Sequence, residues 1–285
     1  MISWPKSLIA EIAERRCIIV MGAGASTGCI SADGSIHPPD WETLLKSALQ
    51  LVRNNSDTEF AERLINDKKY LDAAQIIADN VDSANFTKFL KDRLVTPNFS
   101  PSEIHKIIHD LDLKIVLTTN YDDIYDRYCL QVSANRGHNV CRYYEDHAIN
   151  DIRSTTRLIL KAHGCVSDPT KMVMTRASYF EARRTHSSFY AILDALFLTN
   201  TLLFVGCSLS DPDIQLVLEN ANISAPSHHS HYALVESGRH PSIVNAIKNT
   251  YNIVLLEYPE GQHDEAEEAL RALKDEVLAF RALSA

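Results

Sequence analysis

Cys17-Ile18-Ile19-Val20-Met21, followed by Gly22-Ala23-Gly24-Ala25-Ser26, sets the architecture of this chain. Five consecutive apolar residues are typical of a strand buried on both faces of a parallel sheet, and the glycines end that strand. Glycine lets a backbone approach a diphosphate closely, and Ser26 is expected to cap a following helix whose N–H groups favour an anion. A glycine-rich turn is often only a tight turn, so this segment alone leaves phosphate binding open.

Further apolar segments repeat the strand pattern and alternate with amphipathic segments. Strands are expected at residues 114–118, 157–161, 201–205, 231–235 and 252–256. Helices are expected at residues 8–16, 122–128, 187–198, 211–220, 241–250 and 263–280. Apolar strands alternating with amphipathic helices indicate a mostly parallel sheet covered on both faces. The expected fold is therefore an α/β, doubly wound, Rossmann-like domain.

The region between the first and second strands has a different pattern. Residues 41–111 show helical periodicity, broken by Asn-, Asp- and Pro-containing segments that divide the region into four or five helices. We expect one domain over residues 1–285, with a Rossmann-like core at 17–40 and 112–285 and a helical insertion at 41–111. No zinc module is expected.

Composition limits the classes of protein to which the chain can belong. The chain has 285 residues, of which 45% are hydrophobic and 23% charged, and its formal net charge is −9. Net negative charge argues against direct nucleic-acid binding by the isolated chain, because phosphate affinity needs clustered Lys and Arg. No apolar run approaches the ~20 residues that cross a bilayer, and no secretory signal is evident, so we expect a cytoplasmic protein without membrane contact. The six cysteines form no C-x-x-C pair, so neither disulfides nor a metal site is expected.

Polar residues follow the second predicted strand in the segment Thr118-Thr119-Asn120-Tyr121-Asp122. The carboxamide of Asn120 offers a donor and an acceptor, so it could hold a ribose hydroxyl and an attacking water. Asp122 could orient Asn120 or contact an amide of the ligand. The alternative is that Asn120 or Asp122 only caps the following helix.

Two more strand ends carry similar groups. His163-Gly164 follows the third predicted strand, and an imidazole is the obvious general base for a hydroxyl or water. Gly206-Cys207-Ser208 follows the next strand and could contact a second phosphate or ribose. Asp211 could cap the following helix, contact the ligand, or do both. Because the carboxyl ends of parallel strands share one edge of the sheet, these groups are expected to meet there.

The position of the acidic residues separates possible nucleotide chemistries. A dinucleotide oxidoreductase places an acidic residue at the end of its second strand, about twenty residues past the glycines. Here Asp40 and Glu42 stand at that distance but open a predicted helix, and the next strand starts only at Lys114. Hydride transfer is therefore disfavoured. His105 and His109 lack the intervening glutamate of a zinc-protease helix, so no metal is expected there either.

Taken in order, these segments resemble the SIR2-like family, in particular its bacterial anti-phage defence branch. The similarity covers roughly residues 17–256, and its specific part is the Asn120 and His163 segments. Thr119 replaces the glutamine that sirtuins carry before the asparagine, and the two C-x-x-C pairs of the sirtuin zinc module are absent. The resemblance implies Asn120, His163 and Asp122 as catalytic residues. It implies NAD contacts at Gly22, Ala23, Gly24, Ser26, Thr118, Thr119, Gly206, Ser208 and Asp211.

The resemblance also implies an activity and its control. The defence branch hydrolyses NAD to nicotinamide and ADP-ribose, which depletes the cofactor in an infected cell. Such activity must be gated, which suggests a homo-oligomer and control by a partner, either a HerA-type ATPase or a short Argonaute. The alternatives are a non-catalytic NAD- or ADP-ribose-binding scaffold within a nuclease or ATPase complex, and an NAD-dependent deacylase. The missing zinc module disfavours deacylation.

Overall fold

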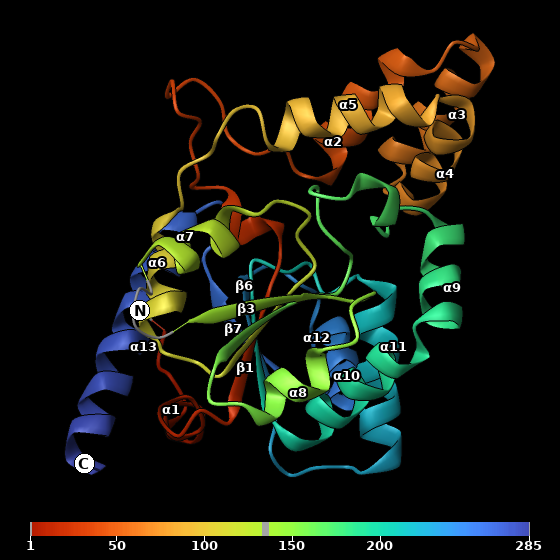
Figure 1. Cartoon of the computed structure of the whole chain (residues 1–285). Helices are drawn as coiled ribbons and strands as arrows, with labels where there is room; N and C mark the ends of the chain where they lie inside the picture. The colour runs from red at the N-terminus through yellow and green to blue at the C-terminus, as the bar shows by residue number, and fades with distance from the viewer. Residues whose placement is uncertain (1, 133–136, 285) are drawn as a thin grey trace.

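The computed structural model describes residues 2–132 and 137–284 and has a seven-stranded, fully parallel sheet at its centre (Figure 1). The strands are β1 (Cys17–Met21), β2 (Ile115–Thr118), β3 (His138–Arg142), β4 (Arg157–Lys161), β5 (Thr201–Val205), β6 (His231–Glu236) and β7 (Ile253–Tyr258). Their order across the sheet is β3-β4-β2-β1-β5-β6-β7. After β1 the chain adds β2 beside it, places β3 at the edge and inserts β4 between β2 and β3; it then crosses to the other side of β1 and adds β5, β6 and β7 in order. The expected doubly wound α/β fold is confirmed.

The strand register brings four strand ends to one level. Met21 pairs with Thr118 on one side and with Val205 on the other, and Thr118 pairs in turn with Lys161. The segments that leave β1, β2, β4 and β5 therefore start side by side. Open α/β sheets bind ligands at the carboxyl edge where the strand order reverses, and here that point is the end of β1.

Helices cover both faces of the sheet. On one face, α1 (Lys6–Ala13), α6 (Glu103–Asp110), α7 (Ile124–Val132) and α13 (His263–Ser284) contribute to a core with strand residues such as Ile19 and Val116. On the other face, α8 (Ala148–Arg153), α9 (Arg176–Thr185), α10 (Ser187–Thr199), α11 (Pro212–Ser224) and α12 (Pro241–Tyr251) pack against residues such as Val20 and Leu117. Figure 1 shows the two groups on opposite sides of the strands. The alternate residues of each buried strand thus serve two cores.

Five α-helices lie between β1 and β2, as the fold prediction required. Four of them, α2 (Trp41–Ala48), α3 (Asn55–Asn66), α4 (Tyr70–Asn80) and α5 (Ser83–Leu94), form a separate layer at the top of Figure 1. This layer has its own core, which also includes Tyr121 and Val166 from the segments after β2 and β4. The fifth helix, α6, packs on the sheet with α13. The insertion therefore contacts the loops that leave the strand ends.

The largest differences from the expected elements are at polar segments. Strand β3 and helices α8 and α9 were not expected, because β3 is a polar edge strand and the sequence of α9 is strongly charged. Helix α7 begins at Ile124, two residues later than expected. The helix expected after the glycine turn is also wrong. Ala23–Ser26 forms a single 3-10 turn, and the next α-helix starts only at Trp41, so Ser26 caps no α-helix there.

Three further findings concern membrane-spanning helices, the cysteines and the last helix. In residues 2–132 and 137–284, no helix combines the length and the apolar character needed to cross a bilayer. All six cysteines lie among these residues and carry free thiols. The apolar stripe of the last helix, which includes Leu270, Leu273 and Val277, packs in the core beside α1.

Candidate functional site at the strand ends

The glycine turns after β1 and β5 touch each other. Gly22 N donates to Val205 O (3.0 Å), and Gly24 N donates to Gly206 O (2.9 Å). A Cβ atom on Gly24 would lie 2.8 Å from the Gly206 Cα, and one on Gly206 would lie 2.2 Å from Ala25 N. Gly206 also has a φ of +66°, which only glycine adopts readily. The glycines are therefore required for the contact between the two turns.

Asn120 is fixed at the end of β2 and points to the β1 turn. Its Nδ2 donates to Gly22 O (3.1 Å) and to Ser26 Oγ (3.4 Å), and its backbone N–H donates to Thr118 Oγ1 (3.0 Å). The Thr118 hydroxyl in turn donates to Met21 O (2.9 Å). No described residue donates to Asn120 Oδ1. The amide is thus anchored by its donor end, and its acceptor end is left for a ligand or a water.

Asp122 lies half-buried between the same turn and the start of α7. Its Oδ1 accepts from Ile124 N (3.0 Å), and its Oδ2 accepts from Ser26 Oγ (3.5 Å). Burial raises the pKa of this carboxyl, with the charge of Lys161 opposing the shift. Of the two capping alternatives, Asp122 does bond the first turn of α7, whereas Asn120 does not.

A buried ion pair between Lys161 and Asp126, which sequence reasoning missed, holds the backbone at Asp122. Lys161 Nζ lies 3.0 Å from Asp126 Oδ2, and these side chains are 1% and 8% exposed. The same ammonium group donates to the backbone oxygen of Asp122 (2.6 Å). Part of the signal was present, because a lysine that ends an apolar strand needs a charged partner if it is buried. The local sequence does not mark Asp126 as that partner, because an aspartate is common in the first turn of an exposed helix.

His163 leaves β4 at the same level as Asn120 leaves β2, two residues past the paired Thr118 and Lys161. The residue is 2% exposed. Its ring meets the Tyr179 ring edge-to-face with centroids 5.0 Å apart, and its carbonyl accepts from Val173 N (3.0 Å). Gly164 follows with a φ of +75°, and a Cβ there would lie 2.6 Å from Lys171 O. The imidazole therefore packs on Tyr179, and the backbone on either side of it is fixed by the segment around Lys171 and Val173.

Asp211 joins the helix α11 to His163. Its Oδ1 accepts from Asp213 N (3.1 Å) and Ile214 N (3.0 Å), which caps α11. Its Oδ2 accepts from Tyr179 Oη (2.8 Å) and lies 3.3 Å from His163 Nε2. The capping alternative is thus observed, and Tyr179 is a site residue that sequence reasoning missed.

The structure brings some predicted residues together and leaves others apart. Asn120, Asp122 and Ser26 form one hydrogen-bonded group. His163 and Asp211, which follow β4 and β5, form a separate close pair with 3.3 Å between Nε2 and Oδ2. Ala23 and Ser208 are exposed at the rim, where the Ser208 hydroxyl contacts Ser210 Oγ (2.6 Å). Thr119 N donates to Met21 O (3.3 Å), and its half-buried side chain has no hydrogen bond among the described residues. Asp40 lies elsewhere and caps α2 by accepting from Thr43 N (2.8 Å), which fits its exclusion as a ribose ligand.

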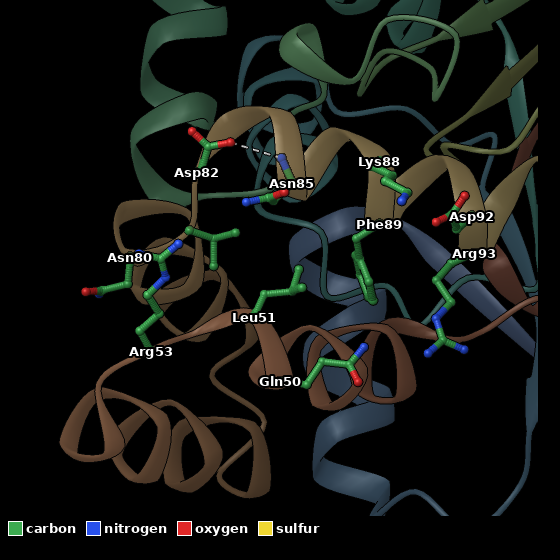
Figure 2. Close-up of a pocket in the computed structure, with 11 residues that line it drawn as sticks. Gln50, Leu51, Arg53, Asn80, Asp82, Asn85, Lys88, Phe89, Asp92 and Arg93 are labelled. Carbon is green, nitrogen blue, oxygen red and sulfur yellow. Dashed lines mark hydrogen bonds between the residues drawn. The ribbon is translucent and has the colours of Figure 1, made fainter.

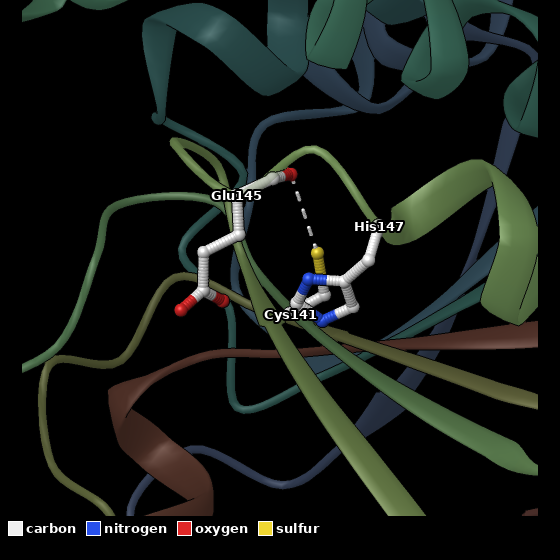
Figure 3. A group of neighbouring side chains, drawn as sticks. All are labelled: Cys141, Glu145 and His147. Atoms are coloured by element: carbon white, nitrogen blue, oxygen red, sulfur yellow. Dashed lines mark hydrogen bonds between the residues drawn. The ribbon is translucent and has the colours of Figure 1, made fainter.

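Two other features of the structure involve none of the predicted site residues. A cavity of about 850 Å³ lies within the insertion, between α5 and the segment after α2 (Figure 2), and none of the predicted site residues lines it. Among the described residues, one group of three potential metal ligands occurs, Cys141, Glu145 and His147 (Figure 3). The Glu145 carboxylate already accepts from Arg142 N (2.7 Å) and Arg142 Nη1 (3.0 Å). The Glu145 carboxylate is therefore already held by Arg142, whose positive charge would oppose a cation there.

The sequence comparisons agree with this geometry. A SIR2-like domain matches residues 114–256, which is half of the chain and contains both Asn120 and His163. A protein of Acinetobacter baumannii (strain 532279) named NAD(+) hydrolase ThsA is 22% identical over 88% of this chain and 48% of its own length. The Enterococcus faecium protein of the same name is 27% identical over 47% of this chain and 28% of its own length. Defense-associated sirtuin 2 of Bacillus subtilis is 25% identical over 74% of this chain and 20% of its own length.

This chain spans about half or less of the length of these curated relatives. The similarity therefore concerns the part that they share with it, and the activity of the whole relatives does not transfer directly. The seven-stranded parallel sheet is consistent with the family match, and the matched residues include Asn120 and His163. The chain belongs to the SIR2-like family.

Proposed function

We propose that this chain hydrolyses NAD to nicotinamide and ADP-ribose and acts in anti-phage defence by depleting NAD. The observation that carries the proposal is the level placement of Asn120 and His163 on the neighbouring strands β2 and β4, beside the glycine turn of β1. Relatives named NAD(+) hydrolase and Defense-associated sirtuin support it. Gly22, Ala23, Gly24, Ser26, Thr118, Thr119, Gly206 and Ser208 would hold the diphosphate and ribose.

The residues supply each part of a hydrolytic reaction. The bond from the ribose C1′ to nicotinamide breaks, and its electron pair leaves with nicotinamide through an oxocarbenium-like transition state. A water held by Asn120 Oδ1 forms the new C1′–O bond. His163 takes the proton of that water, directly or through a ribose hydroxyl, and releases it to solvent. Asp122 would orient the amide end of the substrate.

We further propose that the activity is gated by oligomerisation or by a partner, such as a HerA-type ATPase or a short Argonaute. Asn120 and His163 are only 7% and 2% exposed, and the two glycine turns are in contact. We therefore expect the site to open before substrate enters. An ungated NAD hydrolase would also deplete the NAD of its own host.

The alternative function is a non-catalytic NAD- or ADP-ribose-binding scaffold, because the same residues could hold the ligand without cleaving it. The two functions are separated by incubating the purified protein with NAD and measuring nicotinamide and ADP-ribose. The chain is assayed alone at several protein concentrations, and then with each class of partner. Hydrolysis requires both products in equal amounts. Binding of NAD with no release of nicotinamide under any condition would contradict hydrolysis and support the scaffold.

A further inference from the structure

Two carboxylates at the start of α11, Asp211 and Asp213, each accept a hydrogen bond from a tyrosine hydroxyl. Asp213 is buried, its Oδ1 pairs with Arg183 Nη1 (2.7 Å), and its Oδ2 accepts from Tyr190 Oη (2.7 Å). Asp211 likewise accepts from a tyrosine, Tyr179, but no Lys or Arg among the described residues pairs with it. The only ion-pair contact of Asp211 within the described chain is His163 Nε2, at 3.3 Å.

From this arrangement we infer that Asp211 and Tyr179 are positioning residues for His163. When substrate is bound, Asp211 accepts the Nε2–H of the imidazole, which leaves Nδ1 unprotonated and able to accept the proton of the attacking water or ribose hydroxyl. Once His163 has taken that proton, the Asp211 carboxylate stabilises the imidazolium, as the aspartate of a catalytic triad does. This role rests on the proposed NAD hydrolysis.

Tyr179 fixes both members of the pair. Its hydroxyl donates to Asp211 Oδ2, while its ring packs edge-to-face on the His163 ring. Burial, followed by the charge of Asp211, raises the pKa of Tyr179 well above its ordinary value, so the hydroxyl stays a donor. The Nε2 to Oδ2 contact does not yet have hydrogen-bond geometry, since Nε2 is a buried atom without a hydrogen-bond partner. Catalytic hydrogen bonds are often long in unliganded sites and shorten when substrate binds.

The charged and titratable groups around His163 come from three elements. Asp211 and Asp213 face it from α11, Tyr179 faces it from α9, and Tyr121 lies in the segment before α7 with its ring centroid 6.4 Å from that of His163. Arg183 balances the charge of Asp213. Tyr121 is committed to Val173 O, to which its hydroxyl donates (2.7 Å). Asp211 is thus the carboxylate available to His163.

The test uses the full chain with ¹⁵N-labelled histidine, and it compares Asp211→Asn, Tyr179→Phe and Tyr190→Phe. Asparagine is also a good helix cap, so Asp211→Asn keeps α11 capped. Tyr190→Phe is the matched control, because it also removes a tyrosine hydroxyl from a carboxylate of α11. The His163 nitrogen signals are assigned by their loss in His163→Gln.

In the wild-type protein, His163 should be a single Nε2–H tautomer. Asp211→Asn should populate the other tautomer and lower kcat for nicotinamide release by about 100-fold, with KM for NAD changed less than about threefold. Tyr179→Phe should change the tautomer population and kcat in the same direction, but less than Asp211→Asn does. Tyr190→Phe should leave the tautomer population and kcat unchanged. An Nδ1–H tautomer in the wild type, or wild-type signals and kcat in Asp211→Asn, would overturn the role of Asp211. If the tautomers behave as described but no variant or wild type releases nicotinamide, the proposed function fails and the pairing stands.

Discussion

Replacing Lys161 by methionine should destabilise the protein strongly, although the substitution keeps most of the side-chain volume. Lys161 and Asp126 are 1% and 8% exposed, and their charged atoms lie 3.0 Å apart. Removing one partner of a buried ion pair leaves the other charge uncompensated, which costs about 3 to 5 kcal/mol. The Asp122 carbonyl would lose its hydrogen bond as well. With a urea m-value of about 3 kcal/mol/M, the unfolding midpoint should fall by about 1 to 1.7 M.

The effect should also depend on pH in a defined direction. Burial already raises the pKa of Asp126 above its ordinary value of 3.8, and the charge of Lys161 opposes the shift. In Lys161→Met the charge that opposes the shift is gone, so the pKa of Asp126 rises further in the folded state. The folded carboxyl then binds a proton more readily than the same carboxyl in the unfolded chain. Stability then falls as pH rises through the folded pKa, and it recovers as pH drops. The stability gap between variant and wild type should narrow as pH is lowered from about 7 to 4.

Two comparisons complete this test by urea unfolding. Lys46→Met removes an exposed i,i+4 pair with Glu42 and should cost no more than about 0.5 kcal/mol. Lys161→Met combined with Asp126→Leu removes both buried charges and should recover most of the loss. A Lys161→Met protein as stable as Lys46→Met at pH 7, or a gap that widens on acidification, would refute the reasoning.

Three further predictions concern the turns, a buried histidine and metal. Gly206→Ala should lower the unfolding temperature far more than Gly34→Ala, since both have positive φ but only Gly206 abuts Ala25; equal losses would contradict the contact. Burial lowers the pKa of His105 from 6.5 to about 4, so stability measured in urea should fall by up to about 3 kcal/mol between pH 6.5 and 4. His105→Gln should flatten that slope, and an unchanged slope would exclude His105 as its source. Nicotinamide release should survive dialysis against EDTA, and loss restored by zinc would show a metal requirement.

The main elements of the fold could be predicted because their signal is local. The strand Cys17–Met21 and the strands at Thr201 and Arg157 are apolar runs bounded by glycine or polar residues, and they appear where expected. Strand β3 carries His, Asn and Arg within five residues, and it forms only because β4 provides a partner at the edge. Its pairing is a tertiary effect that the local pattern does not contain.

In the candidate site, too, some residues have a local sequence signal and others depend on tertiary packing. The positions of Asn120 and His163 could be predicted because each polar residue lies two residues past a buried strand, and the register places them level. Tyr179 could not be found, because its role depends on α9 packing across the end of β4. The helix expected after Ser26 was wrong because the chain turns away after one 3-10 turn, with Thr27 Oγ1 donating to Gly24 O (2.9 Å). The roles of Asn120, His163 and Tyr179 toward NAD are still predictions.

Nicotinamide release from NAD by the wild type, Asn120→Ala and His163→Ala, under one activating condition, tests the central claim most directly. Asn139→Ala is a matched control, because its exposed amide donates to Asp151 Oδ1 (2.8 Å), away from the strand ends. We predict release by the wild type and Asn139→Ala, and a loss of at least about 100-fold in each site variant. Each variant must first show wild-type unfolding behaviour. Equal release by folded His163→Ala and wild type would contradict the account.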